Sequence, residues 1–144
     1  MFGKFTEKAR RVIFFARYEV SRLGASEVRT EHLLLGLLRE RKDLLIRFLP
    51  AHVTAEELRR QIEARVLAGP KIPTSVEVPL SGEVKEVLLY AAEESENLSD
   101  KYVRVEHLLL GLLRREGSLA KQVLTENGVA LSQVRQTLRG EAEE

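Results

Sequence analysis

Two identical segments, each opening with an acidic residue and a histidine, are the first candidates for chemistry in this sequence. EHLLLGLLR occurs at residues 31–39 and again at residues 106–114. Glu31 and Glu106 therefore occupy equivalent positions, each in the first turn of a predicted helix. A carboxylate there stabilises the helix by about 0.3–1 kcal/mol through its dipole, and the same carboxylate is able to bind a guanidinium group. The sequence leaves both roles open.

Two hydroxyl residues complete the candidate sites. Thr6 and Ser81 lie 75 residues apart, and each precedes an apolar pattern typical of an amphipathic helix, so we expect both to be N-caps. Free backbone N–H groups at a helix start attract phosphate. If the first helix of each copy begins beside a central helix, a hydroxyl and a carboxylate together would hold a ligand that carries both signs of charge. Phosphorylated arginine is such a ligand.

Other chemistry has weaker candidates. The three histidines are His32, His52 and His107, and none lies four residues from another, as the HExxH zinc motif requires. We expect His32 and His107 to be partly buried and hydrogen-bonded to the backbone. The sequence has no GxSxG segment, no Gly-rich phosphate loop and no Ser/His/Asp pattern. It therefore predicts a non-catalytic protein with no metal and no cofactor.

Composition restricts the class of partner. Lys and Arg total 23 against 22 for Asp and Glu, so a net charge of +1 provides no long-range attraction for nucleic acid or an anionic membrane. Cysteine is absent, which excludes disulfides and cysteine-ligated zinc. No apolar run approaches the ~20 residues of a membrane span. We expect a soluble, cytoplasmic protein with no nucleic-acid or membrane partner.

The elements that must position these residues are repeated as well. A shift of 75 residues aligns the apolar stripes of two predicted helices without a gap, which indicates an internal duplication. The aligned pairs include Phe5 with Leu80, Val12 with Val87, Ala16 with Ala91 and Leu23 with Leu98. The residue pattern of each copy predicts four helices. Gly36 and Gly111 lie inside the central helices at a cost of about 0.5–1 kcal/mol relative to alanine, so we expect another backbone to approach there.

We therefore predict an all-α fold, in which eight helices form one pseudo-twofold domain over residues 1–144. The first repeat covers residues 1–68 and the second covers residues 80–140. The linker, residues 69–79, holds three of the four prolines and should run extended over the surface. Because the apolar central helices of the two repeats can bury each other, we expect a monomer.

The segments MFGKFTEKARRVIFFA, TEHLLLGLLRE and VEHLLLGLLRR together resemble the Clp N-terminal repeat domain, most closely that of ClpC-type AAA+ unfoldases. The resemblance covers essentially the whole chain. It implies a helical double repeat on an ATP-driven hexamer, which receives protein substrates and adaptor proteins and passes them to a partner peptidase. No Walker A motif is present. A free-standing regulator that lacks the motor and competes for adaptors or substrates is the alternative, and a purely structural helical domain is a third.

The resemblance also implies specific ligand-binding residues. In some ClpC-type domains, phosphoarginine is recognised in two pockets, each with a hydroxyl at the start of a first helix and a glutamate at the start of a central one. On this sequence the pockets would pair Thr6 with Glu31 and Ser81 with Glu106.

Two departures from the family pattern distinguish these pockets. Val105 stands where the family has a threonine before the second central helix, and Val105 cannot cap that helix as Thr30 could cap the first. Glu83 places a carboxylate where the family usually has a basic residue. A carboxylate opposes phosphate binding, so we expect the pocket at Thr6 to be the stronger.

Overall fold

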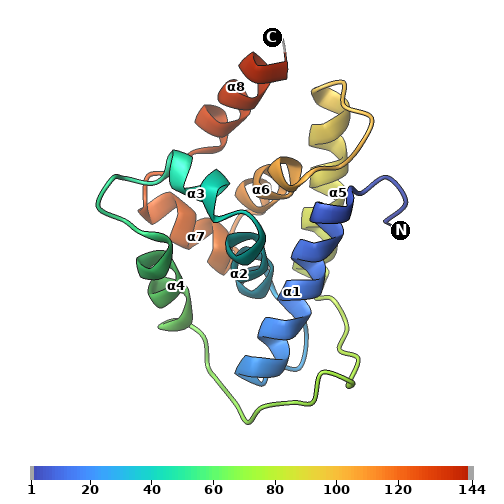
Figure 1. Ribbon diagram of the computed structural model, residues 1–144, viewed down its shortest axis with the longest axis vertical. Helices are drawn as coiled ribbons and strands as arrows, with labels where there is room; N and C mark the ends of the chain where they lie inside the picture. The colour runs from blue at the N-terminus through green and yellow to red at the C-terminus, as the bar shows by residue number, and fades with distance from the viewer. Residues whose placement is uncertain (1, 143–144) are drawn as a thin grey trace.

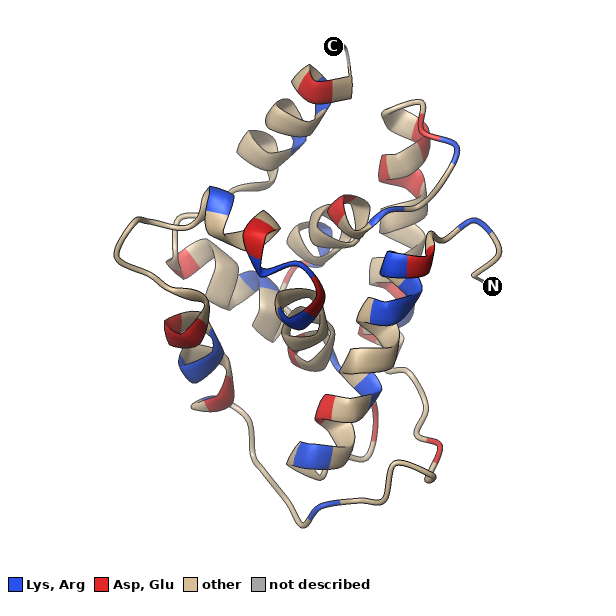
Figure 2. Ribbon diagram, viewed as in Figure 1, with Lys and Arg blue, Asp and Glu red and all other residues tan. Residues whose placement is uncertain are grey.

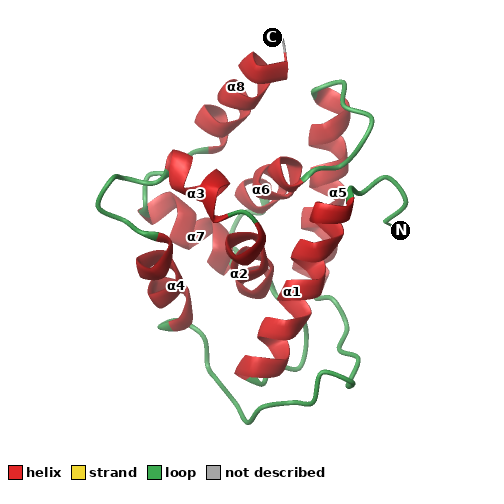
Figure 3. Cartoon of the chain, viewed as in Figure 1, coloured by secondary structure: helices red, strands yellow, loops and turns green. Residues whose placement is uncertain are grey.

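The computed structural model describes residues 2–142, and this part of the chain forms eight α-helices and no strands (Figures 1 and 3). The helices of the first half are α1 (Glu7–Leu23), α2 (Thr30–Glu40), α3 (Lys42–Phe48) and α4 (Ala55–Glu63). Those of the second half are α5 (Gly82–Asn97), α6 (Val105–Arg114), α7 (Leu119–Glu126) and α8 (Leu131–Ala142). The predicted all-α fold, with four helices in each copy, is confirmed.

The first helix of each half begins where its hydroxyl residue predicts. The hydroxyl of Thr6 accepts a hydrogen bond from the Ala9 N–H at 3.1 Å. The hydroxyl of Ser81 accepts one from the Val84 N–H at the same distance of 3.1 Å. Each hydroxyl satisfies one of the backbone donors that have no partner inside the helix. The N-cap prediction for both residues is confirmed.

The central helices α2 and α6 lie in the middle of the molecule and are buried on most sides (Figure 1). Leu33, Leu37, Leu108 and Leu112 all have an exposed fraction of 0%. The buried apolar residues of the two halves belong to one continuous cluster. A helix that is apolar around its circumference requires such surroundings, and the two halves provide them for each other.

Two glycines allow these central helices to contact the first helices closely. A Cβ atom built on Gly111 would lie 2.5 Å from the carbonyl oxygen of Val87 in α5. A Cβ atom on Gly36 would meet the carbonyl oxygen of Val12 in α1 in the same way. Only glycine leaves room for this approach between two helix backbones. The prediction made for both glycines is confirmed.

The starts of α2 and α6 are capped by histidine side chains. The Nδ1 atom of His32 accepts a hydrogen bond from the Arg29 N–H at 2.9 Å. The Nδ1 atom of His107 accepts one from the Arg104 N–H at 2.8 Å. Both imidazoles are buried, with exposed fractions of 1% and 2%. The predicted role of these two histidines, a bond to the backbone, is confirmed.

The predicted difference in capping between Thr30 and Val105 is wrong. Thr30 is the first residue of α2 rather than its N-cap, and Val105 is likewise the first residue of α6. The hydroxyl of Thr30 is buried and accepts a hydrogen bond from the Ala120 N–H of α7 at 3.4 Å. Because a histidine fixes the start of each central helix, replacing the threonine by valine does not remove a cap.

The segment between the halves runs over the surface beside α1 (Figure 3). The Gly69 N–H donates to the carbonyl oxygen of Leu23 at 2.7 Å, and the Ile72 N–H donates to that of Ser21 at 2.9 Å. These bonds join the linker to the end of α1. No helix within residues 2–142 combines the length and the apolar character needed to cross a membrane.

Candidate functional site

Glu31 and Ser81 line the same surface cleft, which has a volume of about 460 Å³. A short parallel pairing of the two halves brings them together. The Val28 N–H donates to the carbonyl oxygen of Pro79 at 2.8 Å, and the Ser81 N–H donates to that of Val28 at 2.9 Å. The start of α5 therefore lies beside the start of α2, and a hydroxyl from one half faces a cleft shared with a carboxylate from the other.

The same pairing occurs at the opposite helix starts. The Thr6 N–H donates to the carbonyl oxygen of Val103 at 3.0 Å, and the Val103 N–H donates to that of Lys4 at 2.8 Å. The start of α1 consequently lies beside the segment that leads into α6 and Glu106. We refer to this position as the Thr6/Glu106 site and to the cleft described above as the Ser81/Glu31 site.

This arrangement corrects the predicted pairing of the four residues. The family resemblance implies pairs of Thr6 with Glu31 and Ser81 with Glu106, each within one repeat. Instead, each hydroxyl lies beside the glutamate segment of the other repeat, because the segments before α1 and α5 each pair with the segment before the other half's central helix. A duplication observed in a sequence gives no indication of whether its copies exchange contacts in this way.

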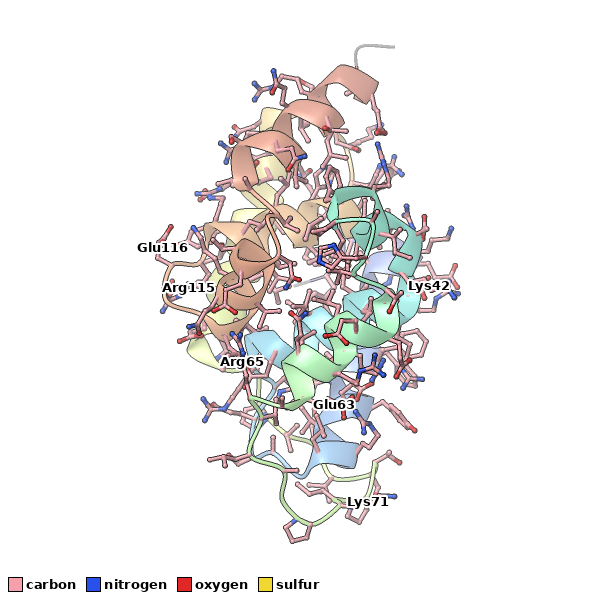
Figure 4. The ribbon with its side chains drawn as sticks, turned by 90° about the vertical axis from the view of Figure 1, so that its left-hand side faces the viewer. Lys42, Glu63, Arg65, Lys71, Arg115 and Glu116 are labelled. Atoms are coloured by element: carbon pink, nitrogen blue, oxygen red, sulfur yellow. The ribbon has the colours of Figure 1, made fainter. Side chains whose placement is uncertain are left out.

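The Ser81/Glu31 site is rich in carboxylates. Besides Glu31 itself, its acidic lining residues are Glu27, Glu83 and Glu86, and its basic ones are Arg29 and Arg115. Arg115 lies 3.1 Å from Glu86 and 3.8 Å from Glu83, and it is visible beside α7 in Figure 4. Burial raises the pKa of Glu31, with the nearby Glu83 acting in the same direction. A cation on the ligand would therefore stabilise the ionised form of Glu31.

The Thr6/Glu106 site has a basic residue in the first turn of its helix. Lys8 lies in the first turn of α1, where the equivalent residue of α5 is Glu83. Arg41, at the end of α2, lies 3.6 Å from the Glu106 carboxylate through Nη1. Arg41 also pairs with Asp43 at 3.1 Å, and these contacts raise the pKa of the guanidinium.

One ion pair has opposite polarity in the two halves. Arg11 of α1 donates to Glu40 of α2 at 3.0 and 3.1 Å through Nε. At the equivalent positions of the second half, Glu86 of α5 accepts and Arg115 after α6 is the cation, at 3.1 Å. The basic partner therefore lies on the first helix at one site and beside the central helix at the other. Figure 2 shows that basic and acidic residues alternate along the helices of both halves rather than forming one large patch.

Sequence reasoning missed Arg41 and Arg115 as members of these sites. The signal was present, since the 75-residue alignment places Arg115 opposite Glu40 and Arg41 opposite Glu116. Both positions reverse their charge between two otherwise similar copies. Such reversals mark places where equivalent sites have acquired different electrostatics.

None of the three histidines lines the Ser81/Glu31 cleft. His52 is exposed in the turn before α4. Burial lowers the pKa of His32 to about 4 and also lowers the pKa of His107. Both imidazoles are therefore neutral near pH 7 and serve as backbone acceptors.

Comparison with known proteins gives consistent matches. The family model described as the Clp repeat (R) N-terminal domain matches residues 4–127 and 80–144. The negative regulator of genetic competence ClpC/MecB from Bacillus subtilis (strain 168) is 35% identical over 137 residues, which are 94% of this chain and 17% of that protein. The chain thus spans only a small part of this relative.

Solved structures share the fold. The N-terminal domain of the chaperone ClpD from Arabidopsis thaliana superimposes with a TM-score of 0.77 at 28% identity, covering 100% of this chain and 97% of that one. A ClpV N-domain in complex with a VipB peptide has a TM-score of 0.74 at 19% identity, covering 95% and 86% of the two chains.

Proposed function

This chain belongs to the Clp repeat N-terminal domain family, and we propose that it is the docking domain through which a ClpC-type ATP-dependent unfoldase receives protein substrates and adaptor proteins. The motor would lie in the remainder of a longer parent chain, since the ClpC/MecB relative is much longer than this domain. The solved complex of a related N-domain with a peptide supports a role in protein binding.

The ligand we propose for the two sites is phosphoarginine on a tagged protein. The observation that carries this proposal is the shared cleft of Ser81 and Glu31, where a capped helix start meets a carboxylate from the other repeat. A phosphate would accept bonds from the hydroxyl and the free N–H groups of α1 or α5. The guanidinium would pair with Glu106 or Glu31.

The Thr6/Glu106 site should bind this ligand more tightly than the Ser81/Glu31 site. Lys8 lies in the first turn of α1, at the helix start proposed to hold the phosphate of the former. Glu83 and Glu86 lie near that of the latter, and Arg115 neutralises them only in part. Like charges a few ångströms apart at a protein surface oppose each other by about 1–4 kcal/mol before salt screening.

A titration of peptide binding tests the proposal. The probe is a fluorescent peptide with one phosphoarginine, and the readout is its anisotropy with the wild-type domain and with the variants Glu106→Ala and Glu31→Ala. Because each variant removes a charge-assisted pair, Glu106→Ala should weaken binding by about tenfold or more. Glu31→Ala should change it by less than about twofold, since the weaker site contributes little to the measured affinity.

Two controls make the result decisive. The same peptide with unmodified arginine should bind at least about tenfold more weakly, because it lacks the phosphate. The variant Glu56→Ala removes a carboxylate from the first turn of α4, outside both sites, and should leave binding unchanged. Equal affinity for the two peptides would overturn the phosphoarginine proposal, and equal losses in Glu106→Ala and Glu31→Ala would overturn the predicted asymmetry.

A further inference from the structure

Each half of the molecule has a second cavity, on the far side of the central helix start. In the second half this cavity measures about 220 Å³ and is lined by Asp100, Arg104, His107 and Glu141, among others. In the first half the equivalent cavity measures about 490 Å³. The cavity of the first half has the larger volume because α4 ends at Glu63, whereas α8 continues to Ala142 and covers the cavity of the second half.

In the second half, a carboxylate of the chain itself occupies the end of the cavity. The Oδ2 atom of Asp100 accepts a hydrogen bond from Arg104 Nε at 2.8 Å. The same oxygen lies 3.9 Å from Nε2 of the buried His107. The imidazole and the guanidinium of this half therefore both face one carboxylate.

In the first half, Ala25 stands at the position of Asp100, so this carboxylate is missing. His32 and Arg29, the equivalents of His107 and Arg104, both line the cavity. Because Nδ1 of His32 accepts the bond from the Arg29 N–H, the proton of the neutral imidazole is on Nε2. That Nε2 atom is buried and has no hydrogen-bond partner among residues 2–142. A buried donor without an acceptor is unfavourable, and an acceptor supplied by a ligand would satisfy it.

The charge of the cavity is also reversed between the halves. The second cavity is lined by three carboxylates and one arginine: Asp100, Glu106, Glu141 and Arg104. The first is lined by one carboxylate and two arginines: Glu31, Arg29 and Arg65. From Val53, which aligns with Val129, the shift between the copies is 76 residues, so Arg65 occupies the position equivalent to Glu141. Figure 4 shows Arg65 just after α4. Arg29 pairs with Glu27 at 3.2 Å, and Arg65 pairs with Glu126, both at the surface. The residues that line the first cavity are therefore less acidic than those that line the second, where Glu106 and Glu141 pair with Arg41 and Arg47.

We propose that the first cavity binds a carboxylate of a protein partner, which accepts a hydrogen bond from His32 Nε2–H and pairs with Arg29. In the second half, Asp100 pairs with Arg104 in the same way, and its carboxylate lies 3.9 Å from His107 Nε2. Val66 and Leu67 border the cavity, and Leu67 is 98% exposed. The residue next to the carboxylate would pack on this apolar edge. The site goes beyond the phosphoarginine sites proposed above, and it lies apart from the Ser81 hydroxyl, although Arg29 and Glu31 border both cavities.

Three short peptides distinguish the source of the carboxylate. The first is acetyl-Ala-Ala-Leu with a free C-terminal carboxylate, the second is acetyl-Ala-Asp-Leu-amide, and the third, acetyl-Ala-Ala-Leu-amide, has no carboxylate. Each is titrated against the labelled domain by NMR, and the readouts are the imidazole signals of His32 and the amide signal of Ala25. We expect saturable shifts with at least one of the first two peptides and none with the third. Binding of both carboxylate peptides would indicate a site for any carboxylate. Binding of only one would show whether the partner's carboxylate is a chain terminus or an aspartate side chain.

The decisive variant is Ala25→Asp, which introduces the carboxylate that the second half already has. It should abolish the peptide-induced shifts of His32 while the domain remains folded, because Asp100 shows that the fold accepts this residue. Ser81→Ala, in the Ser81/Glu31 site, should leave the shifts unchanged, so that this inference and the phosphoarginine proposal fail independently. Undiminished binding by Ala25→Asp, or equal shifts with the peptide that has no carboxylate, would overturn the inference.

A charge-matched pair of variants checks the role of Arg65. Arg65→Gln should weaken binding by about threefold to tenfold, because it removes one of the two cations of the cavity. Arg60→Gln makes the same change on α4 at an exposed residue that pairs with Glu57 outside the cavity, and it should have no effect. Equal effects of the two variants would show that net charge alone, rather than this cavity, attracts the peptide.

Discussion

Arg39 of α2 donates a hydrogen bond to Glu19 of α1, with 3.1 Å between Nη2 and Oε1. Glu19 has an exposed fraction of 0%, and Arg22 and Arg59 also donate to its carboxylate, at 2.9 and 3.2 Å. A buried carboxylate is tolerated only with such partners. Because the three arginines come from α1, α2 and α4, this one carboxylate joins three helices of the first half.

Replacing Glu19 with glutamine should lower the free energy of unfolding by about 1–3 kcal/mol, since the amide loses the charge-assisted bonds and leaves three guanidinium groups close together. Urea denaturation at neutral pH measures this change. Glu77→Gln makes the same substitution on the exposed linker and should shift stability by less than about 0.5 kcal/mol. Similar values for both variants would show that the network contributes little.

Acid should destabilise the domain through His32. Burial lowers the pKa of His32 from 6.5 to about 4. Between these values the unfolded chain binds a proton that the folded chain does not, so stability is lost as the pH falls through this window. The contribution of this residue is at most about 3 kcal/mol. An NMR titration of the His32 imidazole checks the premise, and a midpoint near its ordinary pKa would contradict it.

Gly111→Ala should destabilise the domain by about 1–3 kcal/mol, because its Cβ atom would press against the backbone of α5 and neither helix can shift freely. Gly140→Ala is the matched control. Gly140 lies in α8, and apart from the neighbouring residues and backbone of this helix no atom of residues 2–142 lies within 4 Å of its Cβ position. Alanine there should therefore leave stability unchanged or raise it by about 0.5–1 kcal/mol. Thermal denaturation of both variants distinguishes close helix packing from helix propensity.

Leu37→Ala should cost about 2–5 kcal/mol, as expected when a fully buried leucine is truncated in a close-packed core. Leu67→Ala removes the same atoms from a side chain that is 98% exposed, and we expect a change of less than about 0.5 kcal/mol. If chemical denaturation gave less than about half a kcal/mol for Leu37→Ala, the central position of α2 would be contradicted.

Local signals in the sequence were sufficient to predict the helices. Thr6 and Ser81 marked the starts of α1 and α5, and the glycines Gly36 and Gly111 marked the points where helices cross closely. Each of these features depends on residues within one or two helical turns, or on the absence of a side chain. The duplication then supported each prediction a second time.

Relationships between the two halves could not be predicted in the same way. The pairing of each hydroxyl with the other repeat's glutamate depends on two backbone bridges, Phe5 with Val103 and Val28 with Leu80, whose partners are far apart in the chain. The buried charges were missed for a related reason. Glu19 lies on the apolar stripe of α1, but two of the three arginines that permit its burial, Arg39 and Arg59, come from other helices.

Glu83→Arg should strengthen phosphoarginine binding at the Ser81/Glu31 site. The substitution removes a carboxylate from the first turn of α5 and adds a cation there, which reproduces the position of Lys8 in α1. Arg115 would lose its contact at 3.8 Å and keep the one to Glu86 at 3.1 Å. In a Glu106→Ala background, where the other site is disabled, we expect the affinity for the phosphoarginine peptide to rise by about tenfold.

Glu96→Arg is the control for this gain. It makes the same change of charge on the same helix, at an exposed residue in the last turn of α5 and far from its start. Because screening at physiological salt limits electrostatic effects to roughly 8 Å, this variant should not improve binding. Anisotropy titrations at low and physiological salt compare the two variants. A gain in Glu83→Arg alone would assign the weakness of the Ser81/Glu31 site to the carboxylate at residue 83, whereas an equal gain in Glu96→Arg would assign it to the overall charge of α5.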